Sequence, residues 1–386
     1  MKIVHICLSG SYNDNWGYHD NLLPKYNKKA GHDVTVITSI FVNSKKHRGY
    51  EKVNPGEYVL DDGVKVIRIP FKKIFAPKLA EKLRTYEGLY KKLEKERPDF
   101  IFIHCIQFLD VLIVAKYLKN NPNCKAVADN HADFMNSARN WLSRNVLHRI
   151  IWKRCAALIN PYVTKFYGVT PARVDFLVNM YNLPKQKVEL LAMGADDEKV
   201  EETKNENIRK QIRKRYNINP DDFLIMTGGK IDTNKPQTLL LMEAVKKLNY
   251  PKVKLLIFGS VVPELKEKFN CLISDNIKYI GWVDSKDTYN YFSAADLIVF
   301  PGLHSVFWEQ VVGLGKPCIF KYIQGFTHID LNGNCKFIYR DSVDEIKDII
   351  SEIINNNKLY EQMKKIAESR GKEIFSYKRI ANKSLE

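Results

Sequence analysis

Short apolar runs alternate with stretches of helical periodicity along most of the chain. The runs at 3–8 and 33–38 flank a stretch at 19–30 that keeps helical spacing and stops at Gly31. Further strands are predicted at 64–69, 100–104 and 126–130, and an apolar run at 156–160 precedes a polar turn region. Continuous apolar strands that are separated by helices indicate a parallel sheet covered on both faces.

The same pattern restarts after a polar, charged stretch that begins near Gly194 and has the composition of a linker followed by a basic helix. Strands are then predicted at 223–227, 253–258, 277–280, 297–300 and 317–320, with helices at 238–248 and 287–294. The tail at 344–386 is predicted to be helical throughout. These patterns predict a second domain of the same α/β class.

The composition agrees with two soluble domains, because 386 residues with 45% hydrophobic and 27% charged side chains are enough for two cores. The seven cysteines are scattered and never form a C-x-x-C pair, so neither a disulfide framework nor a zinc site is indicated, and we expect a reduced, cytoplasmic setting. The apolar run at the N-terminus is short, and no run reaches about 18 residues. We therefore expect neither a signal peptide nor a membrane span.

The charge is strongly basic, with 61 Lys and Arg against 44 Asp and Glu, a net charge of +17. Residues 1–200 carry +12 of it, which points to an anionic partner such as phosphates, nucleic acid or a lipid surface. Lysines and arginines are densest at 71–97, where apolar residues keep helical spacing. This stretch could lie on an anionic membrane surface, or it could be an ordinary amphipathic helix that covers a sheet.

Small residues follow the first predicted strand, where Ser9, Gly10 and Ser11 could hold an anion or a sugar hydroxyl. The loop lacks the G-x-G-x-x-G fingerprint, which disfavours an NAD enzyme. Trp16 and Tyr18 in the same loop could stack on a sugar face or pack into the core.

Two lysines lie near the first strand of the second domain. Gly228 and Gly229 follow that strand, and Lys230 and Lys235 flank a short loop before a helix that begins near Gln237. Because both lysines and the helix dipole favour the same anion, this loop is a candidate diphosphate site, although solvated surface lysines would give the same pattern.

A single acid, Glu309, begins an apolar helix after the strand that ends at Phe300. Its carboxylate could accept hydrogen bonds from both vicinal hydroxyls of a ribose, or it could simply favour the helix dipole. His304 and Ser305 lie just before it and are expected to face the substrate.

His131 follows the strand at 126–130 and lies between Asp129 and Asp133. It could donate a hydrogen bond to a substrate, or it could be a structural histidine. The three side chains look like metal ligands, but no further cluster in the sequence matches them, so no metal is expected.

Taken together, these features resemble the retaining glycosyltransferases of family 4, and the resemblance covers nearly the whole chain. It rests on 30–38 (AGHDVTVIT), His131, 187–196 (KVELLAMGAD), Gly229 and Lys230 with Lys235, Gly281-Trp282-Val283 and Phe375-Ser376-Tyr377. The resemblance implies the GT-B fold, with two Rossmann-like doubly wound parallel-sheet domains that face each other across a cleft. It also implies a C-terminal helix that crosses back onto the N-terminal domain.

The resemblance assigns residues 1–198 to the acceptor-side domain, 199–370 to the nucleotide-sugar donor domain and 371–386 to the returning helix. The catalytic residues it implies are His131, Lys230, Lys235 and Glu309. Those for the donor are Gly10, Gly229, Lys230, Lys235, Trp282, Val283, His304, Ser305, Val306 and Glu309. Those for the acceptor are Trp16, Tyr18 and His19. A nucleotide diphosphate sugar is the donor substrate, and neither a cofactor nor a metal is expected.

The chain departs from the family signature at one point. The family carries Glu-x7-Glu, whose second Glu matches Glu309, or Gln310 under a different spacing, but 301–307 contains no acid. We expect transfer of a hexose, with retention, to a glycan or lipid-linked acceptor in cell-surface polysaccharide synthesis, in the cytoplasm or at the inner face of the membrane. A silent sugar-nucleotide-binding protein and a GT-B epimerase are the alternatives, whereas nucleic-acid binding rests on charge alone.

Overall fold

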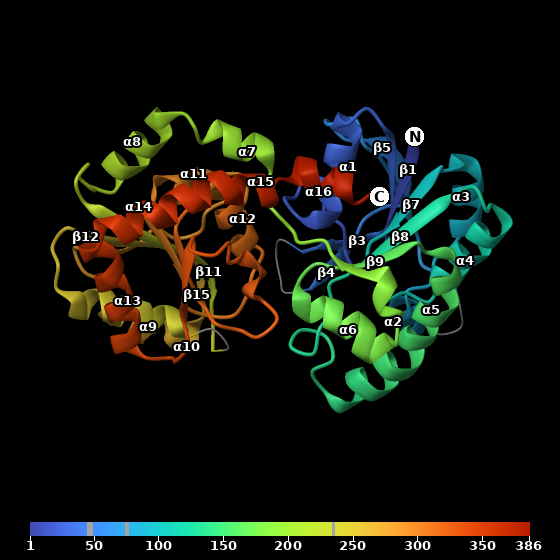
Figure 1. Cartoon of the computed structure of the whole chain (residues 1–386). Coiled ribbons are helices and arrows are strands. Elements are labelled where there is room, and N and C mark those ends of the chain that lie inside the picture. The colour runs from blue at the N-terminus through green and yellow to red at the C-terminus, as the bar shows by residue number, and fades with distance from the viewer. Residues whose placement is uncertain (45–48, 74–76, 234–235) are drawn as a thin grey trace. The chain divides into compact units, whose positions relative to one another are not determined.

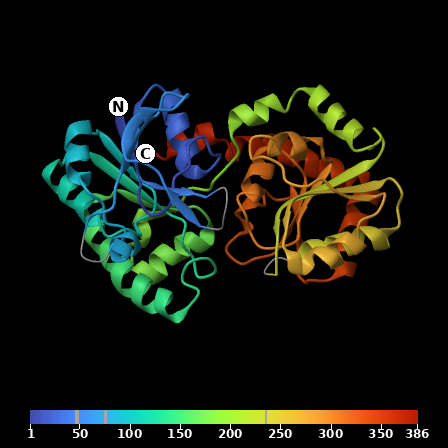
Figure 2. The ribbon, with the colours of Figure 1, turned by 180° about the vertical axis from the view of Figure 1, so that it is seen from behind.

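The computed structural model describes residues 1–44, 49–73, 77–233 and 236–386. Its contacts divide the chain into two compact units, residues 1–192 together with 380–386, and residues 193–379. Figure 1 and, from behind, Figure 2 show that each unit is built on its own sheet. In the described ranges, no helix is both long enough and apolar enough to cross a membrane.

The first unit contains an eight-stranded sheet in the order β10-β9-β8-β7-β1-β2-β6-β5, parallel except where β5 meets β6. Its strands are β1 (Lys2–Cys7), β2 (Asp33–Ser39), β5 (Gly56–Val59), β6 (Lys65–Ile69), β7 (Phe100–Ile103), β8 (Lys125–Asn130), β9 (Lys165–Gly168) and β10 (Val188–Leu190). A separate antiparallel pair is formed by β3 (Phe41–Asn43) and β4 (Tyr50–Lys52).

Helices cover the first sheet because the side chains of a strand alternate between its two faces. Val4 and Ile6 of β1 join the core cluster beneath one set of helices, whereas His5 points to Asn27 of α1 on the opposite face. The helices of this unit are α1 (His19–Lys29), α2 (Pro77–Leu83), α3 (Leu89–Glu96), α4 (Val111–Asn120), η1 (Ser143–Trp152), α5 (Lys153–Ile159), η2 (Asn160–Tyr162), α6 (Pro171–Tyr181) and η3 (Lys185–Lys187).

The second unit contains a six-stranded, fully parallel sheet in the order β13-β12-β11-β14-β15-β16. Its strands are β11 (Phe223–Ile231), β12 (Val253–Val261), β13 (Ile277–Tyr279), β14 (Leu297–Phe300), β15 (Cys318–Lys321) and β16 (Cys335–Ile338). The first strand is therefore central and the order runs outward in both directions, which is the arrangement of a doubly wound dinucleotide-type fold.

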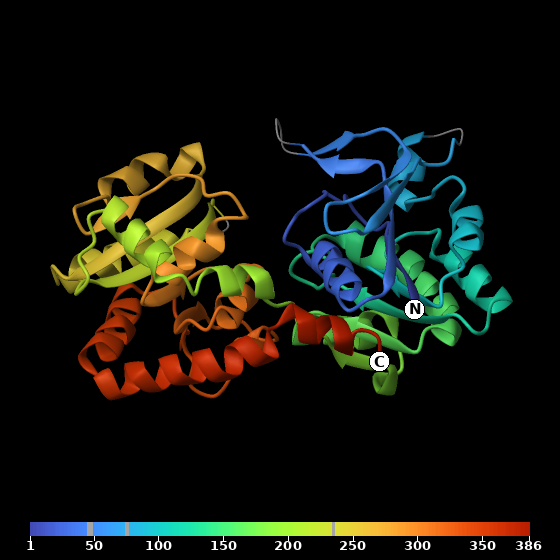
Figure 3. The same ribbon diagram turned by 90° about the horizontal axis from the view of Figure 1, so that it is seen from above.

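Helices lie on both faces of this sheet, with α9, α10 and α13 on one side and α11 and α12 on the other (Figures 1 and 3). Their bounds are α7 (Asp197–Glu202), α8 (Glu206–Arg215), α9 (Gln237–Leu248), α10 (Pro263–Cys271), α11 (Thr288–Ala294), α12 (Phe307–Gly313), η4 (Thr327–Ile329), α13 (Val343–Asn355), α14 (Asn357–Ile366), η5 (Ala367–Gly371) and α15 (Lys372–Ile374). The predicted fold class, two parallel-sheet α/β domains, is confirmed.

The last helix, α16 (Tyr377–Lys383), leads the chain out of the second unit, and residues 380–386 belong to the first. Tyr167 of β9 donates a hydrogen bond from its hydroxyl to the carbonyl of Lys383 over 3.3 Å, and Ser384 is fully buried. The predicted return of the C-terminal helix to the N-terminal domain is confirmed by this packing.

Three predictions of local structure are wrong. The stretch at 71–97 is not one helix, because Arg84 and Gly88 adopt left-handed φ angles of 57° and 75° and separate α2 from α3. The tail is helical only in pieces, since the side chain of Asn356 caps α14 and ends α13. The short strands β9, β10 and β16 were missing from the prediction because none of them is a continuous apolar run.

Candidate active site

Both sheets reverse their strand order beside their first strand, between β1 and β7 in the first unit and between β11 and β14 in the second. In open parallel sheets, the loops at the carboxyl ends of the two strands beside such a reversal diverge and leave room for a ligand. The residues that follow these four strands are therefore the first place to look for chemistry. Several of the sequence-predicted residues follow β1 or β14 or lie at the end of β11, whereas His131 follows β8, and Trp282 and Val283 follow β13.

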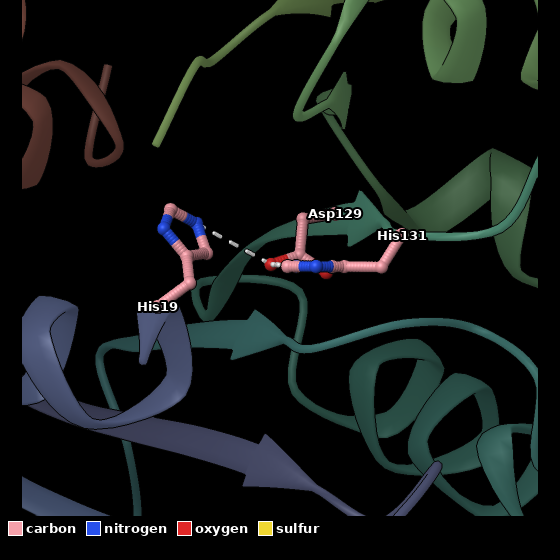
Figure 4. A group of neighbouring side chains, drawn as sticks. All are labelled: His19, Asp129 and His131. Atoms are coloured by element: carbon pink, nitrogen blue, oxygen red, sulfur yellow. Dashed lines mark hydrogen bonds and ion pairs between the residues drawn. The ribbon is translucent and has the colours of Figure 1, made fainter. Parts of the chain in front are cut away.

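In the first unit, three histidine side chains gather around the carboxylate of Asp129 near the end of β8. Its Oδ2 atom lies 3.1 Å from Nδ1 of His104, 3.3 Å from Nε2 of His131 and 3.6 Å from Nε2 of His19. Figure 4 shows His19, from the start of α1, and His131, just beyond β8, converging on Asp129 from different sides. Its other oxygen, Oδ1, accepts the backbone N–H of Cys105 over 2.8 Å.

A directed chain of hydrogen bonds leads into this carboxylate along the face of the sheet that α1 covers. An ionised Asp129 can only accept, so His104 donates from Nδ1 and its Nε2 accepts from Nδ1 of His5 over 3.0 Å. Nε2 of His5 in turn accepts from the amide of Asn27 over 3.1 Å. Every donor in the chain therefore points toward Asp129 and stabilises its charge.

The pKa values of these groups follow from burial and from their neighbours. Burial alone would raise the pKa of Asp129, but His131 and His104 hold it well below its usual range. Burial lowers the pKa of His5 and of His19 well below that of a free imidazole. The arrangement is a carboxylate surrounded by histidines. One of them, His131, keeps 34% of its side chain exposed and is therefore available to a substrate.

Metal-ligand geometry is present here, and it includes two of the three side chains that look like metal ligands in the sequence, Asp129 and His131. Within the described ranges, one group of three potential ligands has its ligating atoms within 4.8 Å of one another, namely His19, Asp129 and His131. Asp133 takes no part, because it pairs with Arg173 over 3.2 Å. The sequence lacked a matching ligand because His19 comes from a distant helix.

The other predicted residues of the first unit lie in the loop after β1. Gly10 is exposed, and its carbonyl accepts a hydrogen bond from Ser39 over 3.2 Å. Trp16 and Tyr18 contact each other with ring centroids 5.2 Å apart, and Tyr18 is 46% exposed. Both aromatic rings are thus paired near His19, which opens α1 with its side chain buried.

In the second unit, three glycines align across neighbouring strands at the predicted donor loop. Gly229 at the end of β11 pairs with Gly259 of β12, and both have φ of +122°. A Cβ atom on Gly259 would lie 1.8 Å from the carbonyl oxygen of Gly229. The N–H of Gly259 donates to the carbonyl of Gly281 over 2.8 Å, and Gly281 has φ of +77°. Gly259 therefore has no room for a side chain, and the positive φ angles of Gly229 and Gly281 also favour glycine.

Lys230 follows directly at the carboxyl end of β11 and extends into solvent with half its side chain exposed. Its ammonium group lies 2.8 Å from the carboxylate of Asp232. Lys235, the second predicted lysine, lies outside the described residues. Trp282 is 72% exposed beyond β13, and Val283 beside it is buried.

The loop after β14 presents a second buried anion. Oε1 of Glu309 lies 2.8 Å from Nε2 of His304 and 2.9 Å from Nε2 of His328, and its side chain is fully buried. Burial opposes ionisation, but the two histidines lower the pKa of Glu309 to about 2. The Oε1 oxygen of Glu309 therefore contacts two imidazoles at once.

Three buried polar atoms of this cluster have no hydrogen-bond partner among the described residues: Oε2 of Glu309, Nδ1 of His328 and Nε1 of Trp308. Ser305 and Val306 begin α12, since their carbonyls accept the N–H groups of Trp308 and Gln310. The aromatic ring of Phe307 comes within 4.0 Å of a Cβ atom built on Gly229, so the loop after β14 lies against the end of β11.

The prediction missed His5, His104 and His328. His104 follows directly after β7, so the rule that selected His131 would also have selected it. His5 sits inside a strand and His328 in a short turn between strands, and neither position carries a local signal.

Two family models match the chain. Residues 23–199 match "Glycosyltransferase Family 4" and residues 208–370 match "Glycosyl transferases group 1". Among curated proteins, the mannosylfructose-phosphate synthase of Agrobacterium fabrum is 22% identical over 61% of this chain and 53% of its own length. An uncharacterised 41.2 kDa protein in the cps region of Klebsiella pneumoniae is 23% identical over 58% of each chain. The chain thus spans little more than half the length of these relatives.

Solved structures match over the full length. The structure of Anabaena HepE in complex with UDP has a TM-score of 0.69 at 14% identity, and the match covers 99% of this chain and 98% of that one. At this identity the likeness shows the fold alone. Since the two family models fall one on each unit, and the fold agrees with them, the chain belongs to the family 4 glycosyltransferases (glycosyl transferases group 1).

Proposed function

We propose that the protein transfers a hexose from a nucleotide diphosphate sugar to a glycan or lipid-linked acceptor, with retention of configuration. The observation that carries the proposal is the strand reversal between β11 and β14, where Lys230 and the loop of His304 flank a row of glycines. Backbone without side chains lets a diphosphate approach closely, and an exposed lysine supplies the opposing charge.

The chemistry needs a cation where the diphosphate departs. Cleavage of the glycosyl–phosphate bond places negative charge on the leaving diphosphate, and a preorganised cation that faces it lowers the barrier. Lys230 is assigned this role, together with Lys235. With lysines in these positions, the reaction needs no metal at the phosphates. Structures of HepE with UDP and with UDP-glucose support this type of donor.

The acceptor and the donor sugar are assigned to residues of both units. His131, oriented by Asp129, would contact the sugar that is transferred. Trp16, Tyr18 and His19 would contact the acceptor, and Gly10 the donor. In the second unit, Trp282 and Val283 would contact the nucleotide base. His304, Ser305 and Val306 would take the place of the absent first Glu.

The curated relatives support the biological setting. One carries a mannosylfructose-phosphate synthase name, and the other is encoded in a cps region. With the support of the cps-region relative, we propose that the reaction belongs to cell-surface polysaccharide synthesis, in the cytoplasm or at the inner face of the membrane.

The test is a panel of nucleotide diphosphate sugars, with release of the free nucleotide diphosphate as the readout. A thermal-shift screen comes first, because a ligand at about 100 times its Kd adds about 2.7 kcal/mol to the free energy of unfolding. Release of nucleotide diphosphate only when an acceptor is added, in the presence of a chelator, is the expected result. Donor binding without turnover on any acceptor would favour a silent binding protein.

The chelator distinguishes between two roles for Asp129 and its histidines: a carboxylate that orients imidazoles, or part of a metal site. Full activity in the chelator agrees with Asp129 as an anion that orients histidines. If the chelator abolished activity and Zn²⁺ restored it, the group His19, Asp129 and His131 would be the metal site. Conversion of the donor to its epimer without release of nucleotide would identify an epimerase instead.

A further inference from the structure

A cluster of large apolar side chains is exposed on the first unit between residues 134 and 158. Trp141 is 73% exposed, and Leu142 and Ile150 are each 60% exposed. The exposed apolar side chains of this 134–158 surface are Phe134, Met135, Trp141, Leu142, Ile150 and Leu158. Single exposed apolar residues are ordinary on a protein surface, but a cluster of this kind marks an interaction site.

One continuous helical segment forms most of the 134–158 surface. It consists of η1 and α5, and Figure 1 shows α5 to the right of α6. His148, Trp152 and Ile159 on one side of this segment are buried in the core. The opposite side therefore faces solvent, and it carries Ile150 together with the exposed bases Arg144, Arg149 and Arg154.

The loop that presents Phe134 and Met135 is held by hydrogen bonds. Oδ1 of Asp133 accepts the backbone N–H groups of Met135 and Asn136 over 2.8 and 2.7 Å. Its Oδ2 accepts from Nε of Arg173 over 3.2 Å. The guanidinium of Arg144 lies 5.2 Å from the centre of the Phe134 ring. The outward position of these apolar side chains is thus built into the turn.

The charge of this region has one sign. Residues 134–158 contain no Asp or Glu and five bases: Arg139, Arg144, Arg149, Lys153 and Arg154. With 44 acids in 386 residues, the chain would place about three acids in a stretch of 25 residues. Acidic side chains are thus absent where apolar side chains are exposed. This combination indicates a partner that carries negative charges beside an apolar region.

We propose that the 134–158 surface docks the protein on an anionic lipid bilayer. Trp141, Leu142 and Ile150 would enter the interface between head groups and acyl chains, while the arginines contact lipid phosphates. A nucleic acid would stack on aromatic rings and contact basic side chains, but it has no apolar region to bury the aliphatic side chains of Leu142, Ile150 and Leu158.

We propose this surface in preference to the stretch at 71–97 that the sequence suggested. In that stretch, Lys72 pairs with Asp110 over 2.8 Å, and Lys92 and Lys95 pair with Glu57 over 2.7 and 3.3 Å. These lysines already have acidic partners within the unit. The exposed side of the 134–158 segment, by contrast, combines bases with apolar side chains and lies in a stretch without acids.

The test is sedimentation of the full chain with vesicles of phosphatidylcholine, alone or with about one third phosphatidylglycerol. Binding to the mixed vesicles, weakened by salt, is expected, together with a blue shift of tryptophan emission that Trp141→Ala removes. Arg144→Glu with Arg149→Glu should weaken binding by about 30-fold or more, because each base near the surface contributes about fivefold. The matched control is Lys78→Glu with Lys82→Glu, which changes the net charge equally within 71–97.

Each outcome decides the proposal, provided that the variants keep the circular dichroism spectrum of the parent. Loss of binding in the arginine pair and in Trp141→Ala, with binding retained in the lysine pair, supports it. Equal loss in the lysine pair, equal binding to vesicles without phosphatidylglycerol, or no binding at all overturns it. Tighter binding to RNA than to vesicles would overturn it as well.

Discussion

Nε2 of His304 lies 2.8 Å from Oε1 of Glu309, and Nε2 of His328 reaches the same oxygen over 2.9 Å. This carboxylate begins α12, yet its side chain has no exposed surface. We infer that Glu309 acts on the donor through His304, whose imidazole it orients, while Gln310 occupies the neighbouring position in the helix. In our proposal, His304 or Ser305 occupies the region where the family signature has its first Glu, and Glu309 holds His304 there.

Replacement of this carboxylate should change how stability depends on pH. The pKa of Glu309 is lowered from 4.5 to about 2 in the folded chain, so its contribution is complete above about pH 4.5 and is lost as the pH falls toward 2. The shift corresponds to about 3 kcal/mol. Glu309→Gln should therefore lower the free energy of unfolding in urea by about this amount at pH 6, and by less than about half as much at pH 3.

Glu361→Gln on the exposed side of α14 serves as the control for this series. It should change the free energy of unfolding by less than about 0.5 kcal/mol at either pH. If Glu309→Gln were as stable as the parent at pH 6, the two histidines would not stabilise a charged Glu309.

Lys230→Ala should lower kcat for nucleotide diphosphate release by about 10²-fold or more, because one cation that faces the departing charge is lost. The control is Lys252→Ala, since Lys252 lies just before β12 at the amino end of the sheet and pairs with Asp221 over 2.6 Å. Full activity of Lys230→Ala would remove this lysine from the donor site. Unfolding temperatures of both variants should match the parent, because both lysines are largely exposed.

Asp129→Asn should destabilise the first unit by about 3–5 kcal/mol, because it removes the charge on which the buried histidines converge. Urea unfolding at pH 7 measures the loss, and Asp33→Asn, whose side chain is 65% exposed at the start of β2, is the matched control. A loss below about 1 kcal/mol for Asp129→Asn would mean that the histidines do not depend on this charge.

Gly259→Ala should cost more than about 3 kcal/mol, because its Cβ would lie 1.8 Å from the carbonyl oxygen of Gly229 and its φ is +122°. Gly56→Ala in β5 meets no atom within 4 Å, and it should cost less than about 1 kcal/mol. Thermal unfolding of both variants, followed by circular dichroism, tests this difference. An unaffected Gly259→Ala would mean that β11 and β12 separate easily at the donor loop.

Patterns within a short window predicted much of the fold. The strand at 297–300 was placed at its actual bounds, because four consecutive apolar residues are buried on both faces. The break between α2 and α3 was not predicted, since the left-handed φ of Arg84 has no signature in the sequence. In the sequence, Gly88 was the local indication of a break between these two helices.

The site was predictable only one residue at a time. His131 was found because it follows a strand, and Glu309 because it begins a helix. The partners that define their chemistry come from other elements, His19 from α1 and His328 from η4, and only the folded sheet brings them together. Spacing along the chain therefore located the candidates but could not show that each carboxylate is enclosed by histidines.

The return of residues 380–386 to the first unit affects the order in which the protein can assemble on the ribosome. Ile380, Ala381 and Ser384 are buried, yet they are synthesised after the entire second unit. The N-terminal unit therefore leaves the ribosome with an uncovered patch, which stays open until the second unit has also emerged. Its final packing is completed last, although its own 192 residues are made first.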